Sequence, residues 1–185
     1  MQPQLLEFFQ AHTHQTFGTG EVIVAAGSEP KGAYLVESGL IKMYAVTASG
    51  KTYIHNLLKP GGIFPLIWLV ADLPNRYYFE TLEKVSVYRA EREQTLAFIR
   101  SHAAVTTDIS RRFLIGMDGY FEHTEVIAEG SAAQKLENTL SMLEKRFGPS
   151  FKAKLRLTHQ ELASLSGLSR ETVTRLLSNH SSSQA

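Results

Sequence analysis

The sequence predicts an α+β protein in which a sandwich or barrel of short antiparallel strands precedes long helices and a C-terminal helix-turn-helix. Short runs rich in β-branched and aromatic residues alternate with turn signals between Gly18 and Arg92. From Glu93 onward glycines become rare and apolar residues recur with helical spacing. Two helix-capping signals separated by a glycine then follow within residues 158–177. These three observations divide the chain into a strand-rich part and a helical part.

The composition is that of an ordinary globular protein, with 43% apolar and 20% charged residues in a chain of 185. The absence of cysteine excludes disulfides, thiolate metal sites, cysteine nucleophiles and thiol-based redox sensing. The longest apolar run, residues 63–71, is too short to span a bilayer, and the first residues lack the features of a signal peptide. We therefore expect a cytoplasmic protein that does not associate with membranes.

Charge is distributed unevenly along the chain. The net charge is +1, yet the part from Phe151 onward carries five basic and two acidic residues. A basic C-terminal part joined to an acidic remainder of the chain suits a partner that is anionic at one end only. The same charges also fit an ordinary solvated surface.

The N-terminal part begins with helical apolar spacing over residues 5–9, which predicts a short leading helix. Strands are expected at residues 21–25, 33–37, 40–46, 52–58, 77–82 and 85–90. Clusters of glycine, serine and proline between these runs supply the turns. Many short strands with this spacing indicate a sandwich or a barrel.

A heptad pattern marks the first long helix. Its seam consists of Phe113, Met117, Tyr120, Thr124 and Ile127, which step by four, three, four and three residues. The other sides carry residues that are expected to face water, among them Arg112 and His123. The seam predicts pairing with a second copy of the chain. The alternative is one amphipathic helix packed on its own β-domain.

The dipeptide Gly130-Ser131 is expected to form a hinge after this helix. A second helix is predicted over residues 132–147, because leucines recur there on one side. Gly148-Pro149 is a strong signal for its end.

The helix-turn-helix prediction rests on two caps and a turn. Thr158 and Glu161 have the spacing of a capping box at the start of a helix. Gly167 interrupts that helix, and Ser169 can cap the next one. The small and apolar residues between these points, such as Val173, are placed to fill the angle between two crossing helices.

Charged residues lie at the exposed start of the second of these helices. Arg170, Glu171 and Arg175 occupy the positions from which a recognition helix presents side chains to base edges. The alternative is a plain helical hairpin with a charged surface.

The segment Ser169-Arg170-Glu171-Thr172-Val173-x-Arg175 resembles the recognition helix of the Crp–Fnr family, close to its cyclic-AMP receptor protein branch. Residues 33–42 resemble the second and third strands of that family, including the turn at Ser38-Gly39. Gly50-Lys51 and Pro60-Gly61 fall at two further family turns, and the long helix falls where the family dimerises. The resemblance covers nearly the whole chain.

This resemblance implies an N-terminal antiparallel β-roll of the double-stranded jelly-roll, cyclic-nucleotide-binding type, a dimerisation helix and a winged helix-turn-helix. The corresponding domains are an effector-sensing domain at 1–108, a dimerisation helix and hinge at 109–130, and a DNA-binding domain at 131–185. The implied function is that of a transcription regulator controlled by an effector, and not of an enzyme. The implied partners are palindromic double-stranded DNA, a second copy of the chain and RNA polymerase.

The resemblance also implies DNA contacts for individual residues. Arg170 and Arg175 would donate to guanines and Glu171 would accept from a cytosine amino group, which fits base-edge chemistry. The phosphate contacts would come from Thr158, Gln160 and Ser169.

The implied effector site departs from the nucleotide-binding members. They carry a glutamate that accepts from the ribose hydroxyl and an Arg-Ser pair that holds the phosphate. Here Leu66 replaces the glutamate, Arg76 matches the arginine, and Tyr77 replaces the serine. Tyr120 and Phe121 stand where the long helix would meet the base. We expect an effector other than cyclic AMP, of apolar or aromatic character, or no effector; no cofactor is identified.

Two rival functions remain open. His12-x-His14 faintly resembles the metal motif of cupins, and a cupin-like metal-dependent enzyme would need further ligands, for which the later segment offers only His55. We therefore expect no metal site. The other rival is a sensory module that regulates by pairing with another protein.

The C-terminal end lacks the β-hairpin wing that follows the recognition helix in the family. Residues 154–157 are expected to form a strand that would pair with such a wing. Without the wing we expect a loosely held helix-turn-helix whose DNA affinity is weak and mainly nonspecific.

Overall fold

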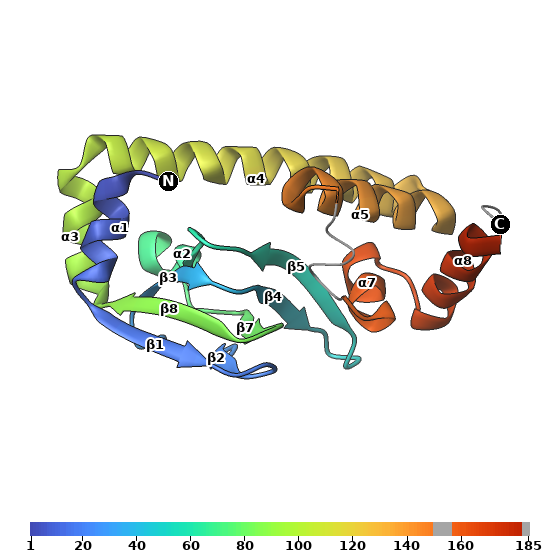
Figure 1. The fold of residues 1–185 in the computed structure, drawn as a ribbon, viewed down its shortest axis with the longest axis horizontal. Coiled ribbons are helices and arrows are strands. Elements are labelled where there is room, and N and C mark those ends of the chain that lie inside the picture. Colours follow the sequence, from blue (N-terminus) through green and yellow to red (C-terminus); the bar gives the residue numbers. More distant parts are fainter. Residues whose placement is uncertain (150–156, 183–185) are drawn as a thin grey trace. The chain divides into compact units, whose positions relative to one another are not determined.

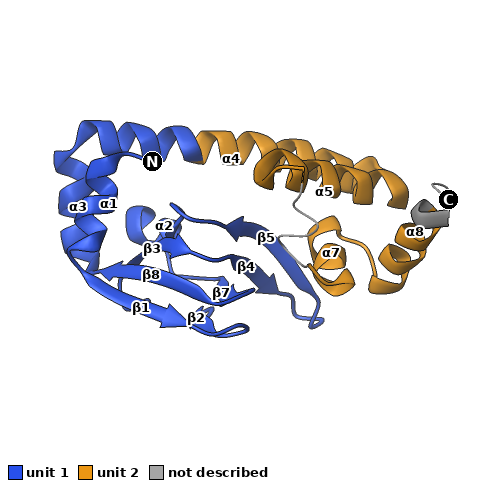
Figure 2. Ribbon diagram, in the orientation of Figure 1, with its two compact units in different colours: residues 1–112 blue, residues 113–185 orange. Residues whose placement is uncertain are grey.

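The computed structural model describes residues 1–149 and 157–182, with the backbone alone for residues 180–182. Its elements are arranged along the chain as Figure 1 shows. The chain divides into two compact units, residues 1–112 and 113–185 (Figure 2).

The first unit contains two four-stranded antiparallel sheets. One has the strand order β1-β8-β3-β6 and the other the order β2-β7-β4-β5. The strands are β1 (Thr13–Phe17), β2 (Val22–Val24), β3 (Ala33–Ser38), β4 (Ile41–Val46), β5 (Thr52–Leu58), β6 (Ile63–Phe64), β7 (Tyr78–Thr81) and β8 (Val85–Ala90). Buried side chains from both sheets, including Val36 and Val87 of one and Ile41 and Phe79 of the other, form a common core. The prediction of an antiparallel sandwich in a β-roll is confirmed.

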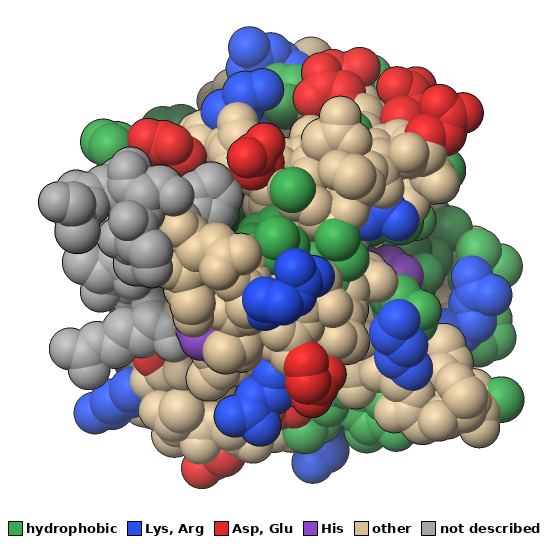
Figure 3. All heavy atoms as spheres, turned by 90° about the vertical axis from the view of Figure 1, so that its right-hand side faces the viewer, with side chains coloured by type: hydrophobic (Ala, Val, Ile, Leu, Met, Phe, Trp, Pro, Cys, Tyr) green, Lys and Arg blue, Asp and Glu red, His purple; other side chains and the backbone are tan. Residues whose placement is uncertain are grey.

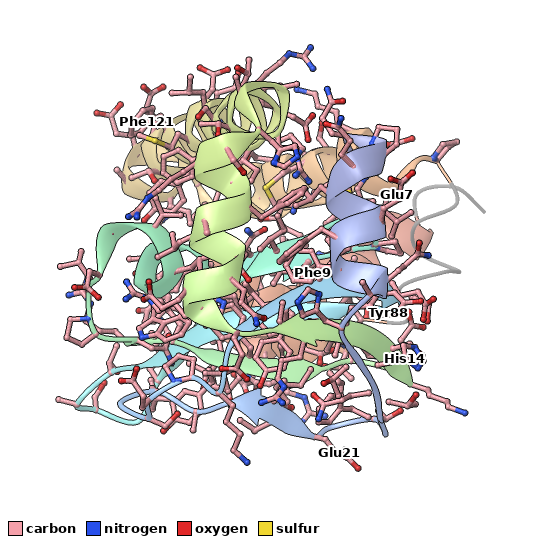
Figure 4. All side chains as sticks on the ribbon, turned by 90° about the vertical axis from the view of Figure 1, so that its left-hand side faces the viewer. Glu7, Phe9, His14, Glu21, Tyr88 and Phe121 are labelled. Carbon is pink, nitrogen blue, oxygen red and sulfur yellow. The ribbon has the colours of Figure 1, made fainter. Side chains whose placement is uncertain are left out.

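Helices of the first unit cover a second core on the sheet that contains β3. These helices are α1 (Pro3–Gln10), α2 (Leu66–Ala71), α3 (Arg92–Ser101) and the first part of α4 (Ala103–Glu129). Phe9 of α1 is completely buried there together with Leu35, Leu69 and Val105 (Figure 4). Arg92 holds α2 to α3, since its guanidinium donates to the Trp68 carbonyl.

The second unit consists of helices. Besides the rest of α4 it contains α5 (Ala132–Phe147), α7 (His159–Ser166) and α8 (Arg170–Ser182). Leu136, Leu143, Leu162 and Val173 are almost fully buried within it. The hydroxyl of Ser131 caps α5 by accepting from the Gln134 backbone N–H. The helix predicted at residues 132–147 is confirmed with those bounds.

Several elements escaped prediction from the sequence. The strand β1, which contains His14, was not expected, since the first strand was predicted at residues 21–25. The mainly polar run of β1 lacks apolar alternation because it is an edge strand paired only with β8. Also unexpected were β6, α2 and the break at His102 that separates α3 from α4.

The strand predicted at residues 154–157 falls outside the described residues, apart from Leu157. Within residues 1–149 and 157–182, no helix is long and apolar enough to cross a membrane.

Candidate functional site

The beginning of α7 is fixed by a complete capping box. The Glu161 backbone N–H donates to the Thr158 hydroxyl over 3.2 Å. In return the Glu161 carboxylate accepts from the Thr158 backbone N–H over 2.8 Å and from the Thr158 hydroxyl over 2.9 Å. The capping box predicted from the Thr-x-x-Glu spacing is therefore present, and it engages the Thr158 hydroxyl.

The turn between α7 and α8 depends on Gly167. This glycine ends α7 in the left-handed region with φ of 69°, which other residues adopt at a cost. The N–H groups of Gly167 and Leu168 both donate to the Ala163 carbonyl. Ser169 then caps α8, because its hydroxyl accepts from the Thr172 backbone N–H over 3.2 Å. Two capped helices joined at a glycine confirm the predicted helix-turn-helix.

The first two turns of α8 form an exposed polar surface. Arg170, Glu171, Thr174 and Arg175 line a shallow hollow on it. The backbone N–H of Glu171 itself and then the Ser169 hydroxyl bind the Glu171 carboxylate, which lowers its pKa below the ordinary value. The surface thus offers two guanidinium donors and a charged acceptor side by side, which is the set of groups that reads guanine and cytosine edges.

Figure 3 shows Lys and Arg side chains scattered over one side of the molecule, with acidic side chains mainly toward its upper edge and a few elsewhere. Exposed basic groups of this kind can contact an anionic partner.

Thr174 belongs to this surface although the sequence reasoning missed it. Its hydroxyl lies 2.8 Å from Nδ1 of His159, which joins the first turn of α7 to α8. The signal was available in the spacing, since Thr174 follows Arg170 by four residues and Glu171 by three, so that all three lie on one helix face. Thr174 was overlooked because a threonine inside a helix is not by itself a recognition signal.

His123 of α4 is a second residue whose role the sequence did not reveal. It was expected to face water, but it is partly buried and hydrogen-bonded on both ring nitrogens. Nε2 lies 2.9 Å from the Leu165 carbonyl of α7, and Nδ1 lies 3.0 Å from Oδ1 of Asn138 on α5. Arg112 also departs from the expectation of a solvated side chain, since it is partly buried and donates to the Gly61 carbonyl over 2.8 Å.

The predicted dimer seam on α4 is largely exposed. Phe113 and Tyr120 are each 50% exposed, Thr124 is exposed, and Met117 and Ile127 are partly buried. Leu114 and Phe121, seven residues apart, are also exposed and widen the apolar stripe. Large apolar side chains contiguous on a helix surface indicate a contact surface for another molecule.

The residues predicted for the effector site have different environments. Leu66 begins α2 and packs against the core under the helices, and Tyr77 is partly buried against the core between the sheets. Arg76 is exposed, and so are Tyr120 and Phe121, which lie in the second unit. No contact within either unit joins all five, so their assignment to one effector site stays a prediction.

Aromatic rings fill the space between the two sheets near Tyr77. The ring of Phe64 stacks on Tyr34 with centroids 5.0 Å apart and on Phe79 with centroids 4.9 Å apart. Burial, the largest influence, raises the pKa of Tyr34. On β5, the ring of the exposed His55 meets that of Tyr77 edge-on, and partial desolvation of the imidazole lowers its pKa.

The histidines proposed for the cupin alternative take part in other interactions. Nε2 of His14 lies 2.8 Å from the Glu37 carboxylate, which also accepts from the Tyr88 hydroxyl over 2.6 Å. His14 and Tyr88 are labelled in Figure 4. His12 contacts the Phe8 carbonyl through Nδ1. Among the described residues, no three histidine or acidic side chains are grouped to hold a metal ion. Nothing in this geometry favours a cupin-like metal centre.

Two family descriptions match the chain. The cyclic nucleotide-binding domain matches residues 14–102, and the Crp-like helix-turn-helix domain matches residues 134–182.

The chain is also similar to curated regulators over most of its length. It is 26% identical over 173 residues to a cyclic AMP receptor protein of Thermus thermophilus, covering 93% of this chain and 77% of the relative. It is 27% identical over 173 residues to a global nitrogen regulator of Synechocystis, covering 88% of this chain and 75% of that relative.

Solved structures share the fold. FixK2 from Bradyrhizobium japonicum superposes with a TM-score of 0.78 at 19% identity, covering 93% of this chain and 85% of the other. The c-di-GMP responsive regulator CLP of Xanthomonas campestris gives a TM-score of 0.76 at 20% identity, covering 99% and 93%.

A β-roll followed by a long helix and a capped helix-turn-helix defines a transcription regulator with a sensing part and a DNA-binding part. The chain belongs to the Crp–Fnr family of transcription regulators, as its recognition-helix sequence indicated. Regulators with this helix-turn-helix bind DNA and act as dimers.

Proposed function

We propose that this chain is a homodimeric regulator that reads a palindromic DNA site through α8 and responds to an effector other than cyclic AMP. The observation that carries the proposal is the exposed grouping of Arg170, Glu171 and Arg175 on the second helix of a fully capped helix-turn-helix. The domain limits proposed for these roles are 1–108, 109–130 and 131–185. The chain acts by binding, and we assign it no catalytic step.

Base reading follows from the chemistry of these three side chains. Each arginine can donate two parallel hydrogen bonds to O6 and N7 of a guanine. Glu171 can accept from the N4 amino group of a cytosine, because an ionised carboxylate is an acceptor only, and the lowered pKa of its carboxyl group favours the same form.

Phosphate contacts are proposed for Thr158, Gln160 and Ser169. Gln160 lies exposed in the first turn of α7, where the helix dipole favours an anion. The hydroxyls of Thr158 and Ser169 already serve as helix caps. Gln160 is therefore the residue of this group that can turn to a phosphate without disturbing a cap.

The proposal of a different effector rests on the packed residues at the implied nucleotide site. Leu66 cannot accept a hydrogen bond from a ribose hydroxyl, and it already contributes to the core next to α2. Tyr77 occupies the position of a phosphate-binding serine and packs against the aromatic core. An apolar or aromatic effector makes better use of such surroundings than a charged nucleotide does.

The dimer proposal rests on the exposed stripe of α4. Two such helices placed side by side about a two-fold axis would bury this stripe and present two copies of α8 to the two halves of a palindrome. Contact with RNA polymerase is proposed from the family resemblance alone.

Selection from a pool of random double-stranded DNA tests this function against the alternative expected from the sequence, a loosely held helix-turn-helix whose DNA affinity is weak and mainly nonspecific. We expect enrichment of an inverted repeat whose half-sites contain a G-x-G element like the TGTGA core of the resembled branch, with centres about 10 base pairs apart. Enrichment of a single unrepeated element, or of no sequence, would contradict the proposal. The exposed Arg111→Ala variant is a matched control, because Arg111 is an arginine of α4 and is not among the residues of the α8 surface.

A further inference from the structure

Two residues of α4 meet the turn of the helix-turn-helix directly. His123 and Ile127 are four residues apart and therefore lie on one face of the helix. His123 reaches the Leu165 carbonyl at the end of α7 over 2.9 Å. Ile127 lies beside Gly167, where a Cβ atom would be 3.6 Å from its Cγ2. Both residues thus contact the turn that connects α7 to α8.

The hydrogen bond from His123 satisfies the Leu165 carbonyl, which lacks a partner within α7. The last carbonyls of a helix lack N–H partners within the helix, and Leu165 is next to the last residue of α7. The N–H groups of Gly167 and Leu168 cannot serve it, because both donate to the Ala163 carbonyl. A carbonyl oxygen only accepts, so Nε2 of His123 must carry the hydrogen.

The second ring nitrogen ties α5 to the same side chain. Nδ1 lies 3.0 Å from Oδ1 of Asn138 and donates to it when the ring is protonated. When the ring is neutral, Nδ1 accepts from the amide nitrogen of Asn138 after a half-turn of that amide. The Asn138 amide can therefore pair with Nδ1 whether this nitrogen donates or accepts. The pairing also spans the predicted hinge at Gly130-Ser131, since residues 123 and 138 lie on either side of it.

We propose that His123 is the positioning residue that fixes the orientation of the helix-turn-helix on the long helix and so sets the spacing between the two half-sites that the dimer reads. The inference rests on the proposed dimeric DNA reading. In a two-fold dimer whose axis runs along paired α4 helices, the joint between α4 and α7 determines the distance between the two copies of α8. His123 joins α4, α5 and α7 at that joint without touching DNA itself.

The test measures affinity for inverted repeats whose half-sites are separated by spacers of increasing length, and for a single half-site. Wild-type protein should bind one spacing best. His123→Leu has similar bulk without a donor and should weaken binding at that spacing by about three- to tenfold, while single-half-site binding stays unchanged. The preference among spacings should flatten accordingly.

Conservative variants separate positioning from simple destabilisation. His123→Gln places an amide nitrogen within reach of the Leu165 carbonyl and should restore the spacing preference, whereas the shorter His123→Asn should not. Asn138→Ala removes only the group that orients the ring and should have an intermediate effect. Glu125→Gln, an exposed neighbour on α4, is the control and should leave the profile unchanged.

The outcomes distinguish this inference from the proposed function. If wild-type protein shows no preference for an inverted repeat, the proposed function fails. If wild-type protein selects one spacing and His123→Leu keeps the same sharp profile, the positioning role of His123 is wrong. Equal losses on single half-sites and repeats, with a lowered melting temperature, would overturn it as well, because they would indicate a role in stability alone.

Discussion

The surface of α8 and the region around α2 and β7 differ in how polar groups are presented. On α8, Arg170, Glu171 and Arg175 are exposed around a hollow, and both helices of the motif are capped by side chains. Around α2 and β7, Leu66 and Tyr77 pack against the two cores, and the family resemblance places both at positions that hold the nucleotide in nucleotide-binding members. This contrast supports the proposal that the groups for DNA reading are present and that those for nucleotide binding are replaced. Membership of a fold family therefore does not by itself identify the ligand.

The largest expected effect concerns the sensing end. Cyclic AMP should bind no better than millimolar, about a thousandfold weaker than a micromolar ligand, because Leu66 and Tyr77 remove two polar contacts worth about 1–3 kcal/mol each. Isothermal calorimetry on the purified protein measures this directly. Micromolar affinity for cyclic AMP would erase the contrast between the two ends.

The next largest effect is expected at the exposed stripe of α4 that is proposed to link two copies of the chain. Replacing Met117 and Tyr120 together by glutamate should place like charges along the seam and give monomers in sedimentation at tens of micromolar. Affinity for a palindrome should fall at least about a hundredfold, because the two half-sites are no longer held by one particle. Glu122→Gln, an exposed change on the same helix, should leave the dimer intact. A monomeric wild-type protein would refute the assignment of the stripe.

A smaller effect is expected for single residues of the helix-turn-helix. Arg170→Ala and Arg175→Ala should each cost about 1–3 kcal/mol on the selected site and relax the preference at one guanine. Gln160→Ala should weaken all sequences alike, since a phosphate contact carries no sequence information. Titrations on selected and scrambled DNA separate the two classes. Equal losses on both DNAs for the arginine variants would remove them from base reading.

Local signals made most of this fold predictable. The capping box at Thr158, the glycine at position 167 and the helix at residues 132–147 each depend on neighbours within a few residues, and the structure contains all three. The sandwich could be predicted because each short strand and each turn between strands is also marked by neighbouring residues.

Contacts between distant residues account for what the sequence did not reveal. The polar edge strand β1 is recognisable only through its partner β8. His123 looked like a solvated residue because its two partners, Asn138 and the Leu165 carbonyl, lie 15 and 42 residues further on. The seam on α4 could be predicted as a pattern, but the additional exposure of Phe121 required the structure.

The smallest expected effect concerns Thr174 and a single methyl group. Its hydroxyl is held by His159, so the methyl group is the part of this exposed side chain left to face a bound groove. A threonine methyl can pack on the 5-methyl of a thymine, and burying one such group is worth about 0.8 kcal/mol, about fourfold in affinity. Replacing each thymine of the half-site by deoxyuridine, one at a time, removes only that methyl.

At one thymine position, the change to deoxyuridine should lower the affinity of wild-type protein about fourfold. The same change should leave the affinity of Thr174→Ser unaltered, because serine keeps the hydroxyl and lacks the methyl group. In His159→Ala the loss of affinity at that thymine should be smaller, because the Thr174 side chain is no longer held and can rotate its methyl group away. A uniform response to deoxyuridine along the half-site would show that the hollow on α8 is read by its charged residues alone. The contrast between the two ends would then rest on Arg170, Glu171 and Arg175, with Thr174 acting only as the acceptor or donor that ties α8 to α7.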